Sequence, residues 1–132
     1  MSLANKNQLK GVFTALVTPF SNQKVDIKSL KKLVQHQLVN KIDGFVINGT
    51  TAESPCLHEN EVAEIFETVK EVSKGMVPLI VGTGSNSTEK TIANTRQAQE
   101  MGADAALVVV PYYNKPTQQG LYLHFKAIAE SS

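Results

Sequence analysis

The sequence has no tryptophan and only one cysteine, Cys56, among its 132 residues. A single thiol cannot form an internal disulfide, so we expect a chain of the reducing cytoplasm. The sequence also lacks a charge excess, because 13 Lys and Arg side chains balance 12 Asp and Glu side chains and leave a formal net charge of +1. A nucleic-acid partner would need a basic surface, so this balance argues against one.

Long apolar runs are missing as well. The longest, Ala105 to Pro111, is far too short to span a bilayer, and Met1 to Lys10 contains no apolar signal core. We therefore expect no membrane partner. What remains is a globular composition, 42% hydrophobic and 19% charged, at a length that suits one domain.

Short apolar runs alternate with amphipathic stretches along the whole chain. We expect strands at 11–17, 44–48, 77–82 and 105–110, and helices starting at Asp26, at Ser54-Pro55 and at Ser87, with a fourth helix around Leu121 to Ile128. Strands that are apolar on both faces and separated by helices are typical of a parallel α/β sheet. Two architectures fit this order: the N-terminal (βα)4 half of a (β/α)8 barrel, which as a whole typically needs about 250 residues, and a small doubly wound parallel sheet.

Polar loops follow the predicted strands at their carboxyl ends, where parallel α/β folds bind ligands. The turn Gly49-Thr50-Thr51 offers backbone N–H groups and hydroxyls that could hold a carboxylate, or that could simply satisfy a polar loop. Of Tyr112 and Tyr113, at most one faces a pocket, because successive strand residues point to opposite faces. A phenol in such a pocket can relay a proton, whereas packing is the simpler interpretation.

No spacing in the sequence predicts a metal site or a cofactor. The three histidines have no metal-ligand spacing with Cys56, and Gly82-Thr83-Gly84 lacks the third glycine of a dinucleotide-binding loop. We therefore assign neither metal nor cofactor.

Four motifs, at four strand ends and in this order, resemble the dihydrodipicolinate synthase family of pyruvate-dependent aldolases. They are Thr14–Phe20 (TALVTPF), Asn48–Ser54 (NGTTAES, similar to the family's G-T-T-G-E-S), Gly82–Asn86 (GTGSN) and Val110–Tyr122 (VPYYNKPTQQGLY). The resemblance extends from Gly11 to the C-terminus. It implies the half-barrel, with 1–10 as an N-terminal segment and 11–132 as a (βα)4 unit that ends before the later barrel strands.

The resemblance also implies an activity, that of a lyase in lysine (diaminopimelate) biosynthesis that forms homo-oligomers. The family condenses pyruvate with aspartate-4-semialdehyde through a Schiff base on a barrel lysine. By motif, Thr50 and Thr51 would hold the pyruvate carboxylate, and Thr51 and Tyr113 would belong to a proton relay. A possible effector site at a subunit interface would use four further positions: Ser54, Leu57, Asn86 and Tyr112.

The sequence departs from the family pattern at three positions. Ala52 replaces a glycine, which would cost about 1–2 kcal/mol if the position requires a positive φ. Glu59 and Lys90 stand where lysine-inhibited members carry a histidine and a glutamate. A lysine ligand's ammonium would be repelled by Lys90, so we expect no lysine feedback.

The Schiff-base lysine of the family lies on a later strand that these residues do not include. We therefore expect the chain alone to be inactive, and we expect its open, apolar sheet edges to cause self-association. Two other hypotheses remain: half of a sialic acid lyase or keto-deoxy-sugar-acid aldolase, and a non-enzymatic anion-binding α/β module.

Overall fold

The computed structural model describes residues 9–132. Most of the predicted N-terminal segment 1–10 lies outside the described residues. No helix among those described combines the length and the apolar character that crossing a bilayer would require.

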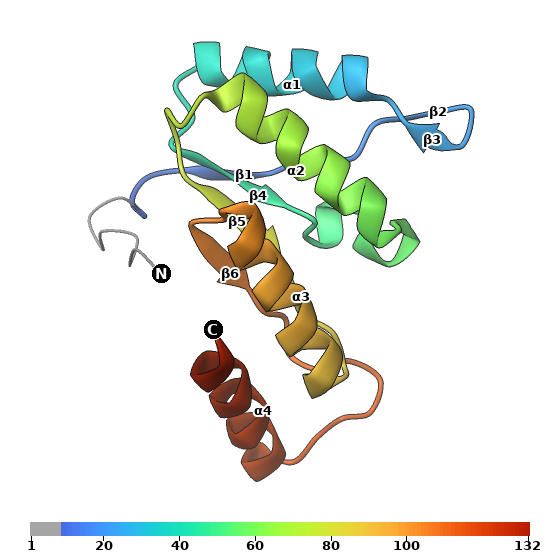
Figure 1. The fold of residues 1–132 in the computed structure, drawn as a ribbon, viewed down its shortest axis with the longest axis vertical. Helices are drawn as coiled ribbons and strands as arrows, with labels where there is room; N and C mark the ends of the chain where they lie inside the picture. Colours follow the sequence, from blue (N-terminus) through green and yellow to red (C-terminus); the bar gives the residue numbers. More distant parts are fainter. Residues whose placement is uncertain (1–8) are drawn as a thin grey trace.

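Four parallel strands form the central sheet, and four helices follow them along the chain (Figure 1). The sheet consists of β1 (Phe13–Ala15), β4 (Gly44–Ile47), β5 (Leu79–Gly82) and β6 (Ala105–Leu107), in that spatial order. The helices are α1 (Ile27–Val39), α2 (Glu59–Ser73), α3 (Thr88–Met101) and α4 (Gln118–Ser131). A β-hairpin, β2 (Phe20–Ser21) with β3 (Lys24–Val25), precedes α1, and two short 3₁₀ helices, η1 (Thr50–Ala52) and η2 (Ser54–Cys56), precede α2.

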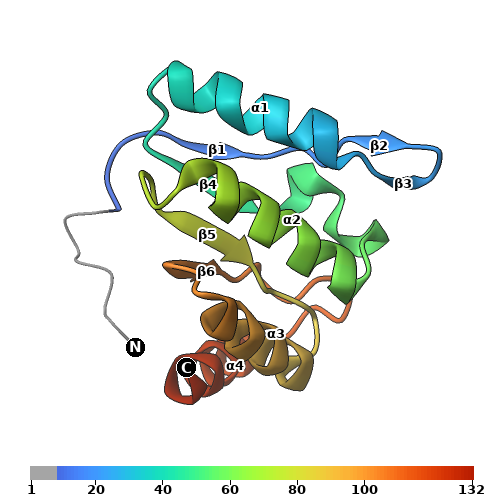
Figure 2. The ribbon, with the colours of Figure 1, turned by 45° about the horizontal axis from the view of Figure 1, so that its top comes forward.

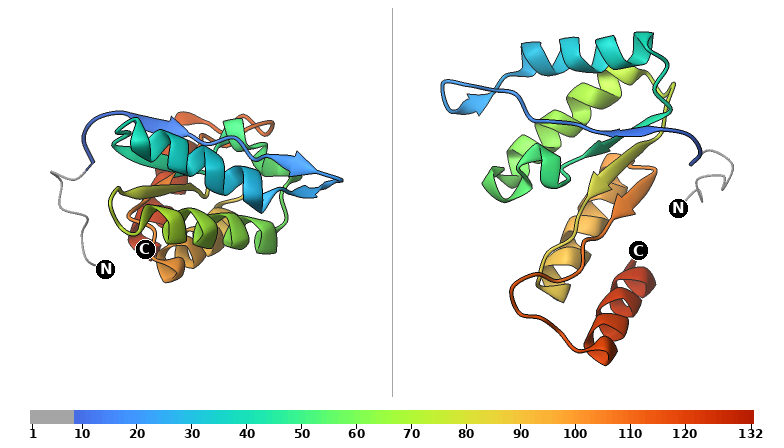
Figure 3. Two further views of the ribbon diagram at one scale, coloured as in Figure 1. Left: turned by 90° about the horizontal axis from the view of Figure 1, so that it is seen from above. Right: turned by 180° about the vertical axis from the view of Figure 1, so that it is seen from behind.

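The strand order decides between the two architectures. Spatial order equals chain order, whereas a doubly wound sheet reverses direction at a switch point. Right-handed crossovers that always advance in one direction put every helix on the same face. Accordingly, α1, α2 and α3 lie behind the sheet when it is viewed from its open face (Figure 3, right). The half-barrel prediction is confirmed, and the doubly wound alternative is wrong.

The hydrophobic core lies between the sheet and the first helices (Figure 2). The sheet contributes Phe45, Ile47, Leu79 and Val81, and α1 and α2 cover them with Leu30, Val34, Ile65, Phe66 and Val69. Phe45 and Phe66 are fully buried. The opposite face of the sheet bears the row Ala15, Val46, Ile80 and Ala105, none of which is fully buried.

Two helix starts follow the predictions. Asp26 caps α1 by accepting the Ser29 N–H at 3.0 Å, and Ser87 caps α3 by accepting the Lys90 N–H at 3.3 Å. Hydrogen bonds from the Ser29 side chain and backbone lower the pKa of Asp26 below its ordinary value.

The predicted start of α2 was wrong. Ser54-Pro55 begins only the short turn η2, because Leu57 is extended, with φ −97° and ψ 137°. The helix starts at Glu59 instead, and the Glu61 carboxylate accepts the His58 N–H at 2.9 Å. This Glu61 bond satisfies a donor at the true start of the helix.

The β2–β3 hairpin and the strand ends also differ from the predictions. The hairpin turn holds Asn22 and Gln23 at φ 50° and 61°, a pair without the glycine that usually marks such a turn. β1 and β6 are shorter than the apolar runs 11–17 and 105–110, since each is an edge strand with a partner on one side only among residues 9–132.

Candidate functional site

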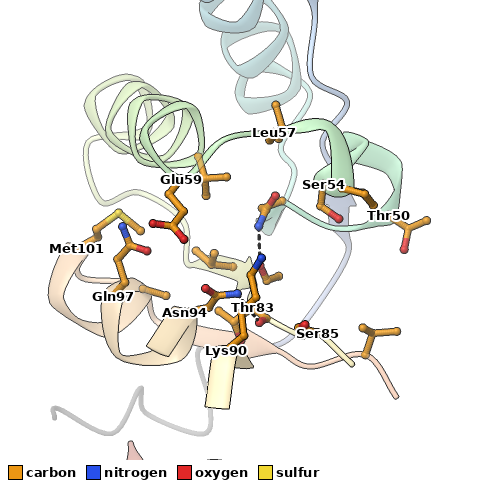
Figure 4. A pocket seen from close by; sticks show the side chains of 18 of the residues that line it. Thr50, Ser54, Leu57, Glu59, Thr83, Ser85, Lys90, Asn94, Gln97 and Met101 are labelled. Carbon is orange, nitrogen blue, oxygen red and sulfur yellow. Dashed lines mark hydrogen bonds between the residues drawn. The ribbon is translucent and has the colours of Figure 1, made fainter. Parts of the chain in front are cut away.

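The loops that follow β4, β5 and β6 lie at the carboxyl ends of these strands and border a cavity of about 370 Å³. The cavity extends between α2 and α3. Figure 4 shows Glu59, Gln97 and Met101 at one end of it and Thr50 and Ser54 at the other. The sequence predicted ligand binding at these carboxyl ends of the strands.

The loop after β4 is held by contacts from two neighbouring strands. Asn48 adopts a left-handed φ of 58° and donates from Nδ2 to the Gly82 carbonyl at 2.8 Å. A Cβ on Gly82 would lie 2.2 Å from the Asn48 carbonyl oxygen, so glycine is required for this close approach. On the other side, the buried Thr18 hydroxyl donates to the Ala52 carbonyl at 2.8 Å. The turn is therefore positioned before any ligand arrives.

Thr50 and Thr51 begin η1, immediately beyond the end of β4, and both are exposed. Thr50 lines the cavity, whereas Thr51 is not among its lining residues. Ala52, which replaces the family's glycine, is buried and has no positive φ. The left-handed residues of this loop are Asn48 and Glu53, each with φ 58°, so the energetic cost that a positive φ would impose on Ala52 does not arise.

The loop after β5 is fixed by buried hydroxyl groups. The Thr95 hydroxyl donates to the Thr91 carbonyl at 2.7 Å, so the Thr83 hydroxyl, 2.9 Å from Thr95 Oγ1, is the donor in that pair. The Thr91 hydroxyl accepts the Ser85 N–H at 3.0 Å, and Asn94 Nδ2 donates to the Thr83 carbonyl at 3.1 Å. α3 is thus attached to the sheet by hydrogen bonds, which explains why its sequence is more polar than that of the other helices.

The structure separates the two adjacent tyrosines. Tyr112 lines the cavity, whereas Tyr113 is 94% exposed and its backbone has φ 70°. Within residues 9–132, no hydrogen bond joins Thr51 to Tyr113.

The four predicted effector positions gather around the cavity. Ser54 and Leu57 line it together with Tyr112. Asn86 lies just outside, and its carbonyl accepts a hydrogen bond from Asn114 Nδ2 at 3.2 Å. Glu59 and Lys90 also line the cavity, so both charged departures from the family pattern border the same space.

Sequence reasoning missed the part of the site that α3 supplies. Asn94, Gln97 and Met101 line the cavity together with Lys90. Their spacing places them on one stripe of the helix, so a largely polar stripe was the available signal. Among residues 9–132, no three His, Cys, Asp or Glu side chains come together as metal ligands would.

Comparison with known proteins assigns the family. The sequence pattern of the Dihydrodipicolinate synthetase family matches residues 8–132. A 4-hydroxy-tetrahydrodipicolinate synthase from Bdellovibrio bacteriovorus is 62% identical over 122 residues, which make up 92% of this chain and 42% of that protein. The corresponding synthase from Thermotoga maritima is 49% identical over 121 residues, 92% of this chain and 41% of that protein.

Solved structures agree with the sequence comparison. The crystal structure of dihydrodipicolinate synthase from Thermotoga maritima superposes with a TM-score of 0.93 and 47% identity, over 95% of this chain and 42% of that one. Chloride-inhibited dihydrodipicolinate synthase from Acinetobacter baumannii, crystallised in complex with pyruvate, gives a TM-score of 0.91 and 45% identity, over 94% of this chain and 43% of that one. The chain thus spans about two fifths of the length of these relatives, and it belongs to the dihydrodipicolinate synthetase family.

Proposed function

We propose that this chain supplies the pyruvate-binding turn of a 4-hydroxy-tetrahydrodipicolinate synthase, a lyase that condenses pyruvate with aspartate-4-semialdehyde. Thr50 and Thr51 hold the pyruvate carboxylate through their hydroxyls and backbone N–H groups. The observation that carries the proposal is the Gly49-Thr50-Thr51 turn itself. Thr50 and Thr51 are exposed, and the turn follows the carboxyl end of β4, where barrel folds bind their ligands.

The surroundings of the turn support carboxylate binding. The Thr18 bond to the Ala52 carbonyl and the Asn48 bond to the Gly82 carbonyl hold the turn from both sides. Donors that are fixed before binding lose little conformational entropy when an anion arrives. The similarity to a relative crystallised with pyruvate points to the same ligand class.

Thr51 and Tyr113 form part of the proposed proton relay. Because Tyr113 is 94% exposed in the single chain, its phenol needs an adjoining subunit to exclude water around it.

The covalent step needs a lysine that the described sheet does not offer. None of the strands β1, β4, β5 and β6 carries a lysine, and Lys115, in the loop after β6, is exposed. A Schiff-base lysine works with a lowered pKa in a desolvated pocket. We therefore propose that these 132 residues bind pyruvate without forming the Schiff base and without turnover.

A pyruvate titration followed by NMR tests the binding turn. We expect Thr51→Val to weaken binding about tenfold or more, because a hydrogen bond to a charged group is lost, and Thr51→Ser to restore it. Pyruvate binding that is unchanged in Thr51→Val would contradict the assignment. Borohydride reduction in the presence of pyruvate, read by intact mass, should give no adduct; an adduct on any lysine would overturn the proposed absence of the nucleophile.

We further propose the cavity lined by Ser54, Leu57 and Tyr112, with Asn86 at its border, as an effector site that does not accept free lysine. Lys90 and Glu59 line it, and Lys90 would repel the ammonium of a lysine ligand. In the same NMR titration, L-lysine should leave the cavity resonances of the unchanged chain in place. Perturbation of those resonances by lysine at millimolar concentration would contradict this part of the proposal.

A further inference from the structure

The carbonyl of Ala52 ends the short helix η1 and finds no donor close by in the chain. In a 3₁₀ helix a carbonyl accepts the N–H of the residue three positions on, which here is Pro55, and proline has no N–H. The next N–H along the chain, that of Cys56, donates instead to the Glu53 carbonyl at 2.8 Å. Because Ala52 is buried, its carbonyl needs a donor from another part of the protein.

Thr18 supplies this donor from 34 positions away. Its hydroxyl donates to the Ala52 carbonyl at 2.8 Å, and Thr18 is only 6% exposed. Loss of the hydroxyl would leave a buried carbonyl without a partner, which is more costly than the loss of a hydrogen bond at the surface. The conformation of η1 therefore depends on a side chain that lies outside its own loop.

The segment that carries Thr18 is itself fixed by the sheet and by α1. Just before it, the Leu16 N–H donates to the Val46 carbonyl on β4 at 3.0 Å. Just after it, the Pro19 carbonyl accepts the N–H of Asp26, the cap of α1, at 2.7 Å. Backbone bonds to regular elements thus hold Thr18 on both sides, so its hydroxyl is a fixed reference point for the turn.

We propose that Thr18 is a positioning residue of the pyruvate-binding turn: it does not contact the ligand, but it fixes the end of η1 and with it the donors of Thr50 and Thr51. This inference rests on the proposed function, since it names the residue that prepares the proposed site. The Ala52 N–H donates to the Gly49 carbonyl at 3.1 Å, so one residue joins the Thr18 contact to the start of the turn. Donors held in place before binding lose less conformational entropy when a carboxylate arrives.

Three variants of the full chain separate the hydroxyl from the size of the side chain. Thr18→Val keeps the shape and removes the donor, whereas Thr18→Ser keeps the donor and removes a methyl group. The matched control is Ser73→Ala. Ser73 is also buried, and its hydroxyl also donates to a backbone carbonyl, that of Lys70 at 3.3 Å. It is the last residue of α2, whereas the turn precedes the start of that helix.

A pyruvate titration followed by NMR measures the effect on binding. We expect Thr18→Val to weaken binding about fivefold or more and Thr18→Ser to stay within about twofold of the unmodified chain. Ser73→Ala should leave the affinity unchanged even where it lowers stability. Unchanged affinity in Thr18→Val would overturn the proposal. The assignment of Thr51 would still stand, because Thr51→Val tests it separately.

Amide hydrogen exchange without pyruvate tests the same contact independently of the ligand. The N–H groups of Ala52 and Glu53 close the turn, each bonded to the carbonyl three residues before it. In Thr18→Val, both should exchange about tenfold faster relative to the core amide of Phe45. Ser73→Ala should not change this ratio. Equal ratios in the two variants would overturn the proposal.

Thr18→Cys covers the case in which Thr18→Val does not fold. A thiol is a weaker donor than a hydroxyl on a side chain of the same shape, so Thr18→Cys should exchange faster at both amides than Thr18→Ser. Equal exchange in these two variants would overturn the proposal. If the unmodified chain binds no pyruvate, the proposed function fails, whereas the exchange ratios still decide whether Thr18 holds the turn. The two failures are therefore distinguishable.

Discussion

Two strands of the sheet have similar apolar sequences but very different burial. In VPLIVG, which contains β5, Leu79 and Val81 are 4% and 2% exposed. In AALVVV, which begins with β6, Leu107 and Val109 are 50% and 47% exposed. The difference comes mainly from the face that each residue occupies. Leu79 and Val81 belong to the core under the helices, whereas Leu107 pairs with Gly82 and lies on the opposite face of the sheet, on a strand that has one partner strand among residues 9–132.

This comparison teaches that an apolar run identifies residues that favour burial but does not show which neighbours bury them. The core cluster draws its strand residues from β4 and β5 and none from β6, and Leu16 joins it from the position just after β1. α4 buries only His124 and Ile128. The last unit of the chain is folded, but Leu107 stays half-exposed among residues 9–132.

A matched pair of substitutions gives the largest expected effect. Leu79→Ala should lower the free energy of unfolding by about 2–5 kcal/mol, because it leaves a cavity in the core. Leu107→Ala should cost less than about 0.5 kcal/mol in dilute solution, where the side chain is half-exposed. Urea denaturation at two protein concentrations measures both.

The concentration series sharpens the comparison. If the expected self-association covers Leu107, the cost of Leu107→Ala should rise with protein concentration while that of Leu79→Ala stays constant, since Leu79 is already buried in the single copy. A large cost for Leu107→Ala at every concentration would show that the two strands do not differ as described.

The second expected effect concerns how α3 is attached. Thr95→Val should lower the free energy of unfolding by about 1–3 kcal/mol, because it leaves the buried Thr83 hydroxyl without its acceptor. Thr95→Ser keeps the hydroxyl and should cost distinctly less. If Thr95→Val and Thr95→Ser are equally stable in thermal and urea denaturation, packing and not hydrogen bonding attaches the helix.

The smallest effect is a pH dependence at the start of α1. Hydrogen bonds from Ser29 lower the pKa of Asp26 in the folded chain below its ordinary value of 3.8. The ionised cap therefore stabilises α1 above that pH, and its contribution is lost as the pH falls through the lower folded pKa. A carboxyl ¹³C NMR titration should show the lowered midpoint, and Ser29→Ala should raise it. A midpoint that Ser29→Ala leaves unchanged would show that these bonds do not set it.

Local signals predicted a large part of the fold. Asp26 and Ser87 were predicted correctly as caps because capping involves only a side-chain oxygen and the backbone N–H groups of the next helical turn. The start of α2 was missed because Ser54-Pro55 carries the same local signal but opens only a short 3₁₀ turn. The hairpin after β1 was missed because Asn22-Gln23 adopts left-handed angles without a glycine.

The residues of the candidate site also divide into those that the sequence predicted and those that it missed. Thr50, Ser54, Leu57 and Tyr112 were found by motif, and they border the cavity. Asn94 and Gln97 were missed because they are polar residues on a polar helix, with no local sign that they face a cavity. Tyr113 was assigned to the relay, yet its phenol is almost entirely exposed in a single copy.

The sequence by itself determined the succession of strands and helices, the caps of α1 and α3 and the turn Gly49-Thr50-Thr51, because each depends on residues close together in the chain. Only the tertiary structure decided that the strands follow one another in chain order, and that α2 and α3 border one cavity with Glu59 and Lys90 on its walls. These features depend on which residues distant in sequence become neighbours, and a list of apolar and polar positions does not specify neighbours.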